Sequence, residues 1–383
     1  MEESKNIKYE PLQRKDDVSY GSGANEGAET VPSRWYSWTG FVGFILTLGV
    51  IAFNIWLNIV LKNDEEKSHY VQPGLVIFLN HAFMFWNLFI AMYLFAKREK
   101  KSFFSVLCSF EVFQVSLLEA SGWTKKEAFR KVAFLAFLYF VPNLFWASSL
   151  NYISVPVSIA IQQSNCAFVY ALAWKLGMVV ATRRKTAACA LCVLGVLLIA
   201  LGTAKDDHGK ENDDDGGNVL LGLLFAIVFP VTISFFSIYF KIYSEHCDTM
   251  EKTCMLTASI GIANTVLLFP FIWLQPLLGL GAVEMPDTPG RFGMLMYFAV
   301  LALGYNFCYM GGIAVLGPLL TSLAVALSLP ASIIFDYIFL GSSGMAFVGL
   351  LGALMVFGSF VVLIYADKTK STKGSAEIEE GQL

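Results

Sequence analysis

The sequence of 383 residues contains little charge, because Asp, Glu, Lys and Arg together make up only 15% of it. These charges gather in the two tails and in a few loops, which leaves long uncharged stretches between them. Soluble domains carry roughly 25% charged residues. Together with 56% hydrophobic residues and a mean hydropathy of +0.59, the scarcity of charge excludes an ordinary soluble domain.

Several motifs are also absent. The sequence has no GxxxxGK[ST] loop, DFG triplet, HExxH or Ser/His/Asp set, and its apolar runs lack regularly spaced arginines. ATP-driven transport, catalysis and voltage sensing are therefore not indicated. There is no N-x-[ST] glycosylation site, and the first 33 residues are too polar for a cleavable signal peptide, so we expect the first span to direct insertion.

Cysteine chemistry is not indicated either. Cys189 and Cys192 have CxxC spacing, but no second pair and no histidine lies near them in the sequence. A zinc or redox site would need such partners. We interpret the cysteines as packing residues and predict no cofactor and no metal.

The sequence does have many apolar runs of roughly 18 residues or more, long enough for a helix to cross about 30 Å of hydrocarbon. We predict an all-α polytopic protein of the lipid bilayer with ten transmembrane helices. The predicted spans are 38–61, 73–96, 131–151, 155–176, 186–203, 218–241, 253–275, 292–313, 317–340 and 344–365. The segment 102–122 is also apolar, but Glu111, Gln114 and Glu119 interrupt it, so we predict an interfacial helix there.

The distribution of basic residues predicts the orientation. Of the 27 lysines and arginines, 22 lie in the tails or in loops on one side of the predicted spans. Cytosolic loops are enriched in Lys and Arg, which places both termini in the cytosol. The acidic loop 204–217 then faces the lumen or the exterior, and the segment 97–130 is cytosolic. The tails 1–37 and 367–383 are polar, and we expect them to be disordered.

A weak internal repeat appears when the sequence is shifted by 163 residues. Asn143 then aligns with Asn306, and an aromatic residue follows each of them three positions later, Trp146 and Tyr309. Further aligned pairs are Ser158 with Thr321, Asn165 with Ser328, and Gly195 with Gly358. Two halves of five spans each, 38–203 and 218–366, must be inverted relative to each other because five is odd. We therefore predict two inverted five-helix repeats, with a substrate site between them.

Polar side chains form stripes on the predicted spans. In SIAIQQSNCAF, residues 158–168, the side chains of Ser158, Gln162 and Asn165 fall within about 60° of one another on a helix. Similar stripes occur in the third and ninth spans. The candidate substrate-binding residues are Asn143, Trp146, Ser158, Gln162, Asn165, Asn306, Tyr309, Thr321, Ser328 and Asp336. The alternative is that these groups only hydrogen-bond neighbouring helices.

Ionisable residues within spans are rare and are functional candidates by default. His81 and Asp336 are the candidates for proton coupling, since an unperturbed histidine titrates near pH 6.5. For His81 the alternative is a neutral ring bonded to another helix. For Asp336 it is an acid at a hydrated helix end.

Two segments carry a resemblance to a known family. YISVPVSIAIQQSNCAFVYALAW at 152–174 and GPLLTSLAVALSLPASIIFDYIFLG at 317–341 resemble the fourth and ninth spans of the drug/metabolite transporter (EamA-like) superfamily. Within it, SNCAFVYALAW at 164–174 is similar to a run in group F of solute carrier family 35, which includes thiamine-transporter-like members. The resemblance implies ten helices in an inverted repeat and carriage of small metabolites by alternating access. Ser164 and Asn165 depart from the Asn and Lys of those members, which leaves the preferred substrate charge open.

The leading hypothesis is a secondary transporter of a small organic solute, such as thiamine or a related cation. One form of this hypothesis couples the transport to protons. Trp86, Trp146 and Tyr309 are expected to flank a cation, since cations bind aromatic faces. The alternatives are a Golgi or endoplasmic reticulum nucleotide-sugar antiporter and a non-transporting scaffold or receptor. The spans offer few Lys or Arg for a diphosphate, which favours a cation or neutral solute.

Localisation and assembly are only hinted at. YEPL at 9–12 has the form of a sorting signal, with Tyr9 and Leu12 as its key residues. It is compatible with an endosomal, lysosomal or vacuolar membrane, and the Golgi and the plasma membrane stay open. A homodimer is a further open alternative.

Overall fold

The computed structural model describes residues 41–56, 73–109, 122–149, 152–153, 158, 161–207, 216–244, 249–274, 285–339, 348 and 351–362. The contacts discussed below all lie within one unit, Ile45–Leu383. Of the other unit, Met1–Phe44, these ranges include only residues 41–44, which are helical.

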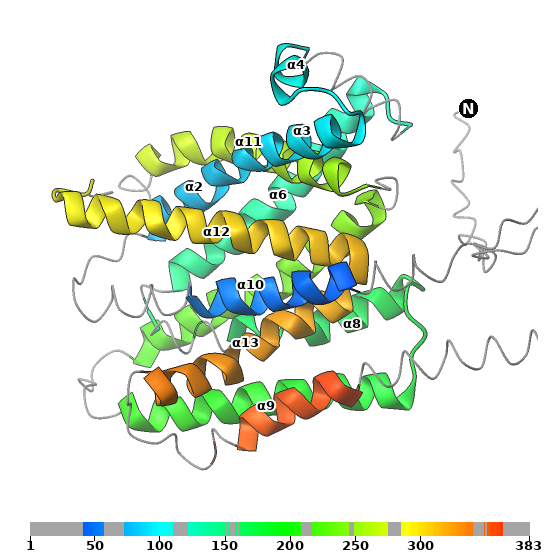
Figure 1. The fold of residues 1–383 in the computed structure, drawn as a ribbon. Coiled ribbons are helices and arrows are strands. Elements are labelled where there is room, and N and C mark those ends of the chain that lie inside the picture. Colours follow the sequence, from blue (N-terminus) through cyan, green and yellow to red (C-terminus); the bar gives the residue numbers. More distant parts are fainter. Residues whose placement is uncertain are drawn as a thin grey trace, which may run out of the picture. The chain divides into compact units, whose positions relative to one another are not determined.

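The described residues are helical and contain no strand. After an apolar helix at Phe41–Trp56, the helices are α2 (Pro73–Phe83), the 3-10 turn η1 (Met84–Trp86), α3 (Asn87–Arg98), α4 (Phe103–Cys108), α6 (Lys125–Ser149), α8 (Asn165–Lys175), α9 (Arg183–Asp207), α10 (Gly216–Ser244), α11 (Met250–Leu274), α12 (Pro289–Leu316), α13 (Pro318–Phe339) and a helix at Leu351–Val362 (Figure 1). The all-α prediction is confirmed for these ranges.

Five stretches are long and apolar enough to cross a membrane, which fits a polytopic membrane protein. They are Leu75–Arg98, Lys125–Trp146, Leu220–Ser244, Met250–Pro270 and Pro289–Leu316. Shorter apolar helices occur at Phe41–Trp56, Pro318–Ser328 and Leu351–Val362. The number ten and the inverted repeat stay predictions. Of the segment predicted to be interfacial, the structure describes α4, and residues 110–121 lie outside the described ranges.

The exposed faces of the helices are apolar, as a lipid environment requires. On α10, Leu220, Leu224 and Ile227 are 61%, 55% and 48% exposed, and their spacing puts them on one stripe. The opposite face of α10 is buried and carries Phe236 and Phe240. Water would disfavour such a stripe, whereas hydrocarbon would not.

The helices pack in an order that differs from their order in the chain. α10 packs against α6 and α8, and α11 packs against α2, α3 and α6 (Figure 1). α12 packs against α2 and α13, and α13 also packs against α8. Helices that are distant in the sequence therefore surround a common interior.

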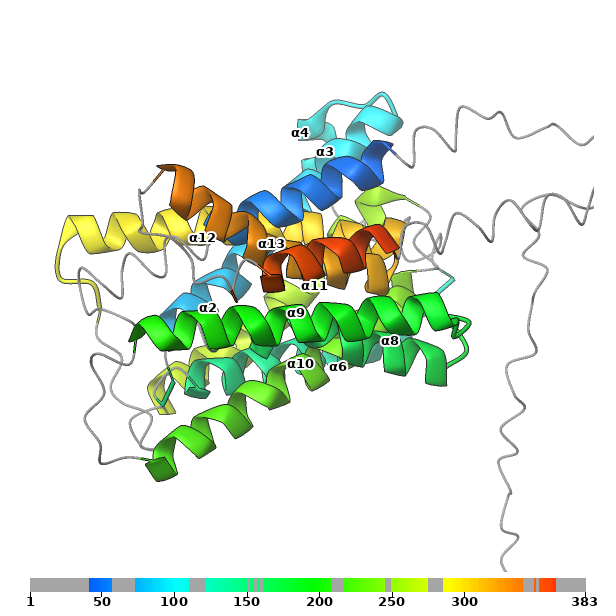
Figure 2. The same cartoon turned by 90° about the horizontal axis from the view of Figure 1, so that it is seen from below.

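Small residues allow two of these helix pairs to approach closely. A Cβ atom on Gly195 would lie 2.7 Å from the carbonyl oxygen of Gly352, so α9 and the helix Leu351–Val362 touch backbone to backbone (Figure 2). Gly261 of α11 lies against Met84, at the 3-10 turn between α2 and α3. Close approach at small residues is a common way for membrane helices to associate, because lipid offers no hydrophobic driving force between helices.

Candidate binding cavity

A cavity of about 100 Å³ lies among the helices of the unit Ile45–Leu383. Its wall comes from the helix Phe41–Trp56, from α2, α6, α8, α10, α12 and α13, and from the segment just before α8. The lining residues are Asn54, Val76, Ile77, Asn80, Tyr139, Asn143, Trp146, Gln162, Asn165, Phe229, Ile233, Phe298, Ala302, Tyr305, Tyr309 and Val325.

The chemistry of this wall is polar but uncharged. Among the described lining residues, five carry amide side chains and none is Asp, Glu, Lys, Arg or His. Six others are aromatic. Ligand sites in proteins combine apolar and aromatic walls with a few directed polar groups, as this cavity does.

Asn306 is the centre of a hydrogen-bond network behind the wall. Its side-chain oxygen accepts from the Tyr139 hydroxyl at 2.7 Å, and its nitrogen donates to Oδ1 of Asn80 at 2.6 Å and to the carbonyl of Ala302 at 2.8 Å. Asn306 is fully buried and does not itself line the cavity. It therefore positions Tyr139 and Asn80, which do.

Asn143, the predicted counterpart of Asn306, has a simpler environment. Its nitrogen donates to the carbonyl oxygen of Tyr139 in the preceding turn at 2.6 Å, and its side chain lines the cavity. Asn143 is thus placed to contact a ligand directly, whereas Asn306 acts through its neighbours.

Two further residues of the second predicted half are paired with other helices. The Tyr309 hydroxyl lies 2.8 Å from that of Ser237 in α10. Ser328 accepts a hydrogen bond from Nδ2 of Asn54 at 2.6 Å and donates to the carbonyl of Val325. These contacts fix Tyr309 and Asn54 in the wall.

Two cavity-lining residues of the first predicted half each have a buried polar atom without a hydrogen-bond partner. The indole Nε1 of Trp146 and the side-chain oxygen of Asn165 are buried without a hydrogen-bond partner. The backbone carbonyl of Asn165 does accept a hydrogen bond from Ser234, at 3.3 Å. A buried polar group without a partner is costly, so a free donor and a free acceptor mark this part of the wall.

Aromatic rings line the rest of the wall. Tyr305 and Tyr309, one helical turn apart, have nearly parallel rings with centroids 5.5 Å apart. Tyr139 packs against Phe236 of α10, with centroids 4.6 Å apart. Such faces attract flat rings and cations.

The structure divides the predicted site residues into three groups. The side chains of Asn143, Trp146, Gln162, Asn165 and Tyr309 line the cavity. Four others are buried beside it without lining it, namely Ser158, Asn306, Thr321 and Ser328. Asp336 lies in α13, but its side chain is outside the described part, as are Tyr9 and Leu12.

The hydroxyl groups of Ser158 and Thr321 are hydrogen-bonded to other protein groups. The Ser158 hydroxyl lies 3.0 Å from that of Ser149. Thr321 of α13 donates to the carbonyl of Gly317, the residue before this helix, at 2.9 Å. Both side chains are therefore satisfied by protein groups.

His81 lies behind the wall and is fully buried. Its Nδ1 is 3.4 Å from Nδ2 of Asn264, and its ring meets the edge of Tyr139 at 5.0 Å between centroids. Nε2 has no hydrogen-bond partner. The ring thus touches a cavity residue, Tyr139, without reaching the cavity itself.

Sequence reasoning missed part of the wall and misplaced one residue. It did not single out Asn54 and Asn80, although each is an isolated amide in an apolar helix, nor Tyr305, one turn before Tyr309. The prediction that Trp86 flanks the cavity is wrong, because Trp86 does not line it and is 49% exposed. Trp86 belongs to the turn η1, in which Met84 is the buried residue.

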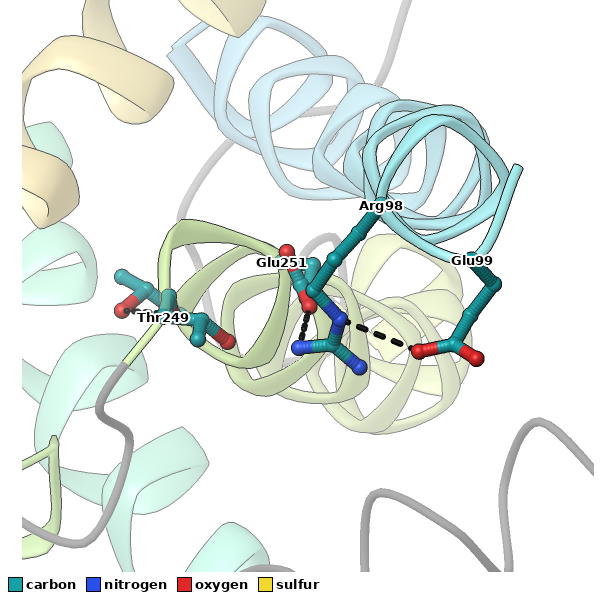
Figure 3. Close-up of polar contacts among 5 residues, drawn as sticks. Arg98, Glu99, Thr249 and Glu251 are labelled. Atoms are coloured by element: carbon teal, nitrogen blue, oxygen red, sulfur yellow. Dashed lines mark hydrogen bonds and ion pairs between the residues drawn. The ribbon is translucent and has the colours of Figure 1, made fainter.

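Polar contacts also join helix ends that do not line the cavity. Arg98, the last residue of α3, forms an ion pair with Glu251 in the first turn of α11 (Figure 3). The Arg98 Nε also lies 3.3 Å from a carboxylate oxygen of Glu99. Lys241, in the last turn of α10, donates a hydrogen bond to the carbonyl oxygen of Ala314 in α12 at 2.8 Å.

The fold and the cavity together define a class: a polytopic α-helical membrane protein with an uncharged polar cavity inside its helix bundle. No protein-family model matches the chain. The chain is 23% identical to an uncharacterized transporter of Schizosaccharomyces pombe, over 85% of this chain and 95% of that protein. It is 18% identical to a thiamine-repressible mitochondrial transport protein of Saccharomyces cerevisiae, over 89% of this chain and 96% of the relative.

A further relative carries the name of the predicted family. The chain is 22% identical to solute carrier family 35 member F5 of Mus musculus, over 65% of this chain and 47% of that protein. The predicted resemblance to this family is confirmed. These relatives are named as transporters and not as enzymes. A crystal structure shares the fold with a TM-score of 0.56 at 12% identity, over 87% of this chain and 98% of the solved one.

Proposed function

We propose that the protein is a secondary-active transporter that carries a small organic solute across a membrane by alternating access. The observation that carries the proposal is the uncharged cavity inside the bundle, lined by five amide side chains and six aromatic ones. A helix bundle that needed only stability would fill this space with apolar side chains. The relatives named as transporters support the same function.

We further propose that the bundle consists of two inverted halves, 38–203 and 218–366, with the cavity between them. Two cross-helix hydrogen bonds support this arrangement. Ser234 of α10 donates to Asn165, and Asn54 donates to Ser328, the residue 163 positions after Asn165. The packing of α2 on α12 has a counterpart in that of α11 on α6. A repeat related by a two-fold axis produces such paired contacts.

The solute we propose is thiamine or a related organic cation. The rings of Trp146, Tyr305 and Tyr309 offer faces to a cationic ring. A nucleotide sugar is disfavoured, because its diphosphate calls for Lys or Arg and the described wall has neither. The nucleotide-sugar antiporter and the scaffold or receptor are the competing functions.

The position of the cavity suggests which side is closed. In the span Leu75–Arg98, the cavity residues Val76, Ile77 and Asn80 lie in the first two turns, whereas Arg98 is the last residue. The ion pair between α3 and α11 then fastens the end that the basic residues assign to the cytosol (Figure 3). We propose that this state is closed to the cytosol and that the pair breaks when the transporter turns inward.

Proton coupling through His81 completes the proposed mechanism. Protonation of the His81 ring would place a charge next to the Tyr139 ring and alter the Tyr139–Asn306–Asn80 network. Asp336 is the second candidate. The proposed setting is an endomembrane or the plasma membrane, with both termini cytosolic and the YEPL segment as a sorting signal.

Uptake by the purified full-length chain in proteoliposomes tests the function. Vesicles that contain the protein should accumulate radiolabelled thiamine or another organic cation above the level of empty vesicles, and Asn143→Ala should abolish the accumulation. Saturable uptake of UDP- or GDP-sugars instead would favour the antiporter. If ligands bind without uptake under any proton or solute gradient, the receptor is favoured.

A further inference from the structure

The short helix α4 packs on α3 with one face and leaves the opposite face exposed. Val106 is buried and Phe103 is partly buried in an apolar cluster that includes the buried residues of α3. On the other face, Phe104 is 72% and Leu107 is 40% exposed, although both follow the last residue of the span Leu75–Arg98. Figure 1 shows α4 beside α3 at the edge of the bundle. An exposed apolar face at this place is typical of a helix that lies in the membrane interface.

Positive charge lies next to this exposed face. Lys97, Lys100 and Lys101 come just before α4 in the chain and are exposed. Arg98, which lies among them, is paired with Glu251. In contrast, within the described ranges no ion pair involves any of the three lysines. Their charge can therefore attract an anion from outside the protein.

The backbone at Lys100 favours glycine, yet the residue is a lysine. Its φ is 53°, and it is the one non-glycine residue with positive φ in the part of the chain that the structure describes. The hydrogen bonds that end α3 surround it: the Glu99 and Lys101 amides donate to the carbonyls of Phe95 and Ala96, both at 2.9 Å. Glycine adopts this conformation at a helix end without strain, whereas a side chain makes it unfavourable. A use for the lysine side chain would explain why the position holds one.

We propose that the surface around α4 binds the headgroups of anionic phospholipids. This α4 surface consists of Lys97, Lys100, Lys101, Phe104 and Leu107. The ammonium groups contact the lipid phosphates, and the two apolar side chains enter the boundary of the acyl chains. Free phosphate would use only the lysines, whereas a membrane lipid uses the whole surface. The basic residues assign this end of the bundle to the cytosol, and the cytosolic leaflet is the one that carries anionic lipids.

Photo-crosslinking of lipids to the full-length protein in nanodiscs tests the proposal at the surface itself. The probes are phosphatidylserine and phosphatidylcholine with a diazirine at the same acyl position, present at equal mole fractions, and adducts on residues 97–109 are counted by mass spectrometry. One lysine near an anionic surface corresponds to about a fivefold change in affinity. The wild type should therefore give at least about tenfold more adducts with phosphatidylserine, and high salt should reduce this ratio.

Substitutions separate the charge from the fold. The pair Lys100→Gln with Lys101→Gln should lower the ratio at least about fivefold, while Lys100→Arg with Lys101→Arg should retain it. Lys100→Gly should lower the ratio without lowering the melting temperature, because glycine suits the positive φ. Phe104→Ser should reduce the adducts of both lipids and leave the ratio unchanged.

The matched control is the exposed pair at the start of α6, Lys125→Gln with Lys126→Gln, which should leave the ratio at residues 97–109 unchanged. Equal adducts from the two lipids in the wild type, or a ratio that survives in the Lys100→Gln and Lys101→Gln pair, would overturn the inference. An equal fall in the control pair would also overturn it, because the preference would then not belong to the α4 surface. Both leaflets of a nanodisc have the same lipids, so the result depends neither on the proposed orientation nor on transport.

Discussion

The two proposed halves of the bundle present residues of similar type to one cavity, but they use them differently. In the second half, Asn306, Tyr309 and Ser328 are bonded to other helices. In the first half, the lining residues Trp146 and Asn165 each have a buried polar atom without a hydrogen-bond partner. We therefore propose different roles for the two halves: the second half holds the wall in place, and the first half contacts the solute.

The largest effect is expected from Asn306→Ala. The substitution removes three hydrogen bonds and leaves the Tyr139 hydroxyl and Asn80 without their partner. We expect uptake to be abolished and the free energy of unfolding to fall by about 2–4 kcal/mol. Asn143→Ala should also abolish uptake, but with a smaller loss of stability, since Asn143 makes one local bond. Equal destabilisation of the two variants, measured by thermal unfolding, would contradict the different roles of the two halves.

Gly195 and Gly358 should differ in the same test, although the repeat aligns them. A Cβ atom on Gly195 would meet the Gly352 carbonyl oxygen at 2.7 Å, whereas on Gly358 it would meet only a Leu191 methyl group at 3.8 Å. We expect Gly195→Ala to cost about 1–3 kcal/mol through overpacking and Gly358→Ala to be close to neutral. Their melting temperatures in detergent provide the comparison. A neutral Gly195→Ala would show that α9 and the helix Leu351–Val362 are not in backbone contact.

The ion pair between Arg98 and Glu251 joins the two proposed halves and should affect conformation more than stability. Glu251 is largely buried and the Arg98 side chain is 44% exposed, so solvent screens the pair in part. We expect Arg98→Ala to cost about 1 kcal/mol and to increase the reactivity of cysteines introduced in the cavity toward a cytosolic-side reagent. The double exchange Arg98→Glu with Glu251→Arg should restore the protection, and Glu99→Gln is the exposed control. Unchanged reactivity in Arg98→Ala would show that this ion pair does not keep the cytosolic side closed.

The smallest effect is expected from Tyr309→Phe, which keeps the ring and removes the bond to Ser237. Stability should fall by about 1 kcal/mol, the usual contribution of a single hydrogen bond. Uptake in proteoliposomes should stay close to the wild-type level. A loss of uptake would mean that the Tyr309 hydroxyl also contacts the solute.

The sequence predicted the helical class well because its signal is strong. Long apolar runs bounded by clustered Lys and Arg leave few alternatives for a chain in lipid, and the described ranges are helical. Asn143, Trp146 and Asn165 could be singled out as cavity residues because polar side chains on one helix face are rare in a span. The number of spans and the inverted repeat stay predictions.

The contacts behind the wall could not be predicted. Helical periodicity shows which face a residue shares, but not which neighbouring helix it meets. Asn306 and Ser328 fitted the pattern of lining residues, yet the structure places them behind Tyr139, Asn80 and Asn54. Trp86 was misplaced because the apolar run around it does not show which side of the helix faces outward, and the structure leaves its side chain 49% exposed.

The most direct test of the central claim is a thermal-shift measurement on the purified protein in nanodiscs with thiamine, its phosphates, other organic cations and UDP- and GDP-sugars. A ligand at 100 times its Kd adds roughly 2.7 kcal/mol of stability. The account predicts a shift with thiamine or another organic cation that disappears in Asn143→Ala. A shift of the same size in Asn143→Ala and in Trp146→Phe would show that the solute binds elsewhere, and would contradict the account.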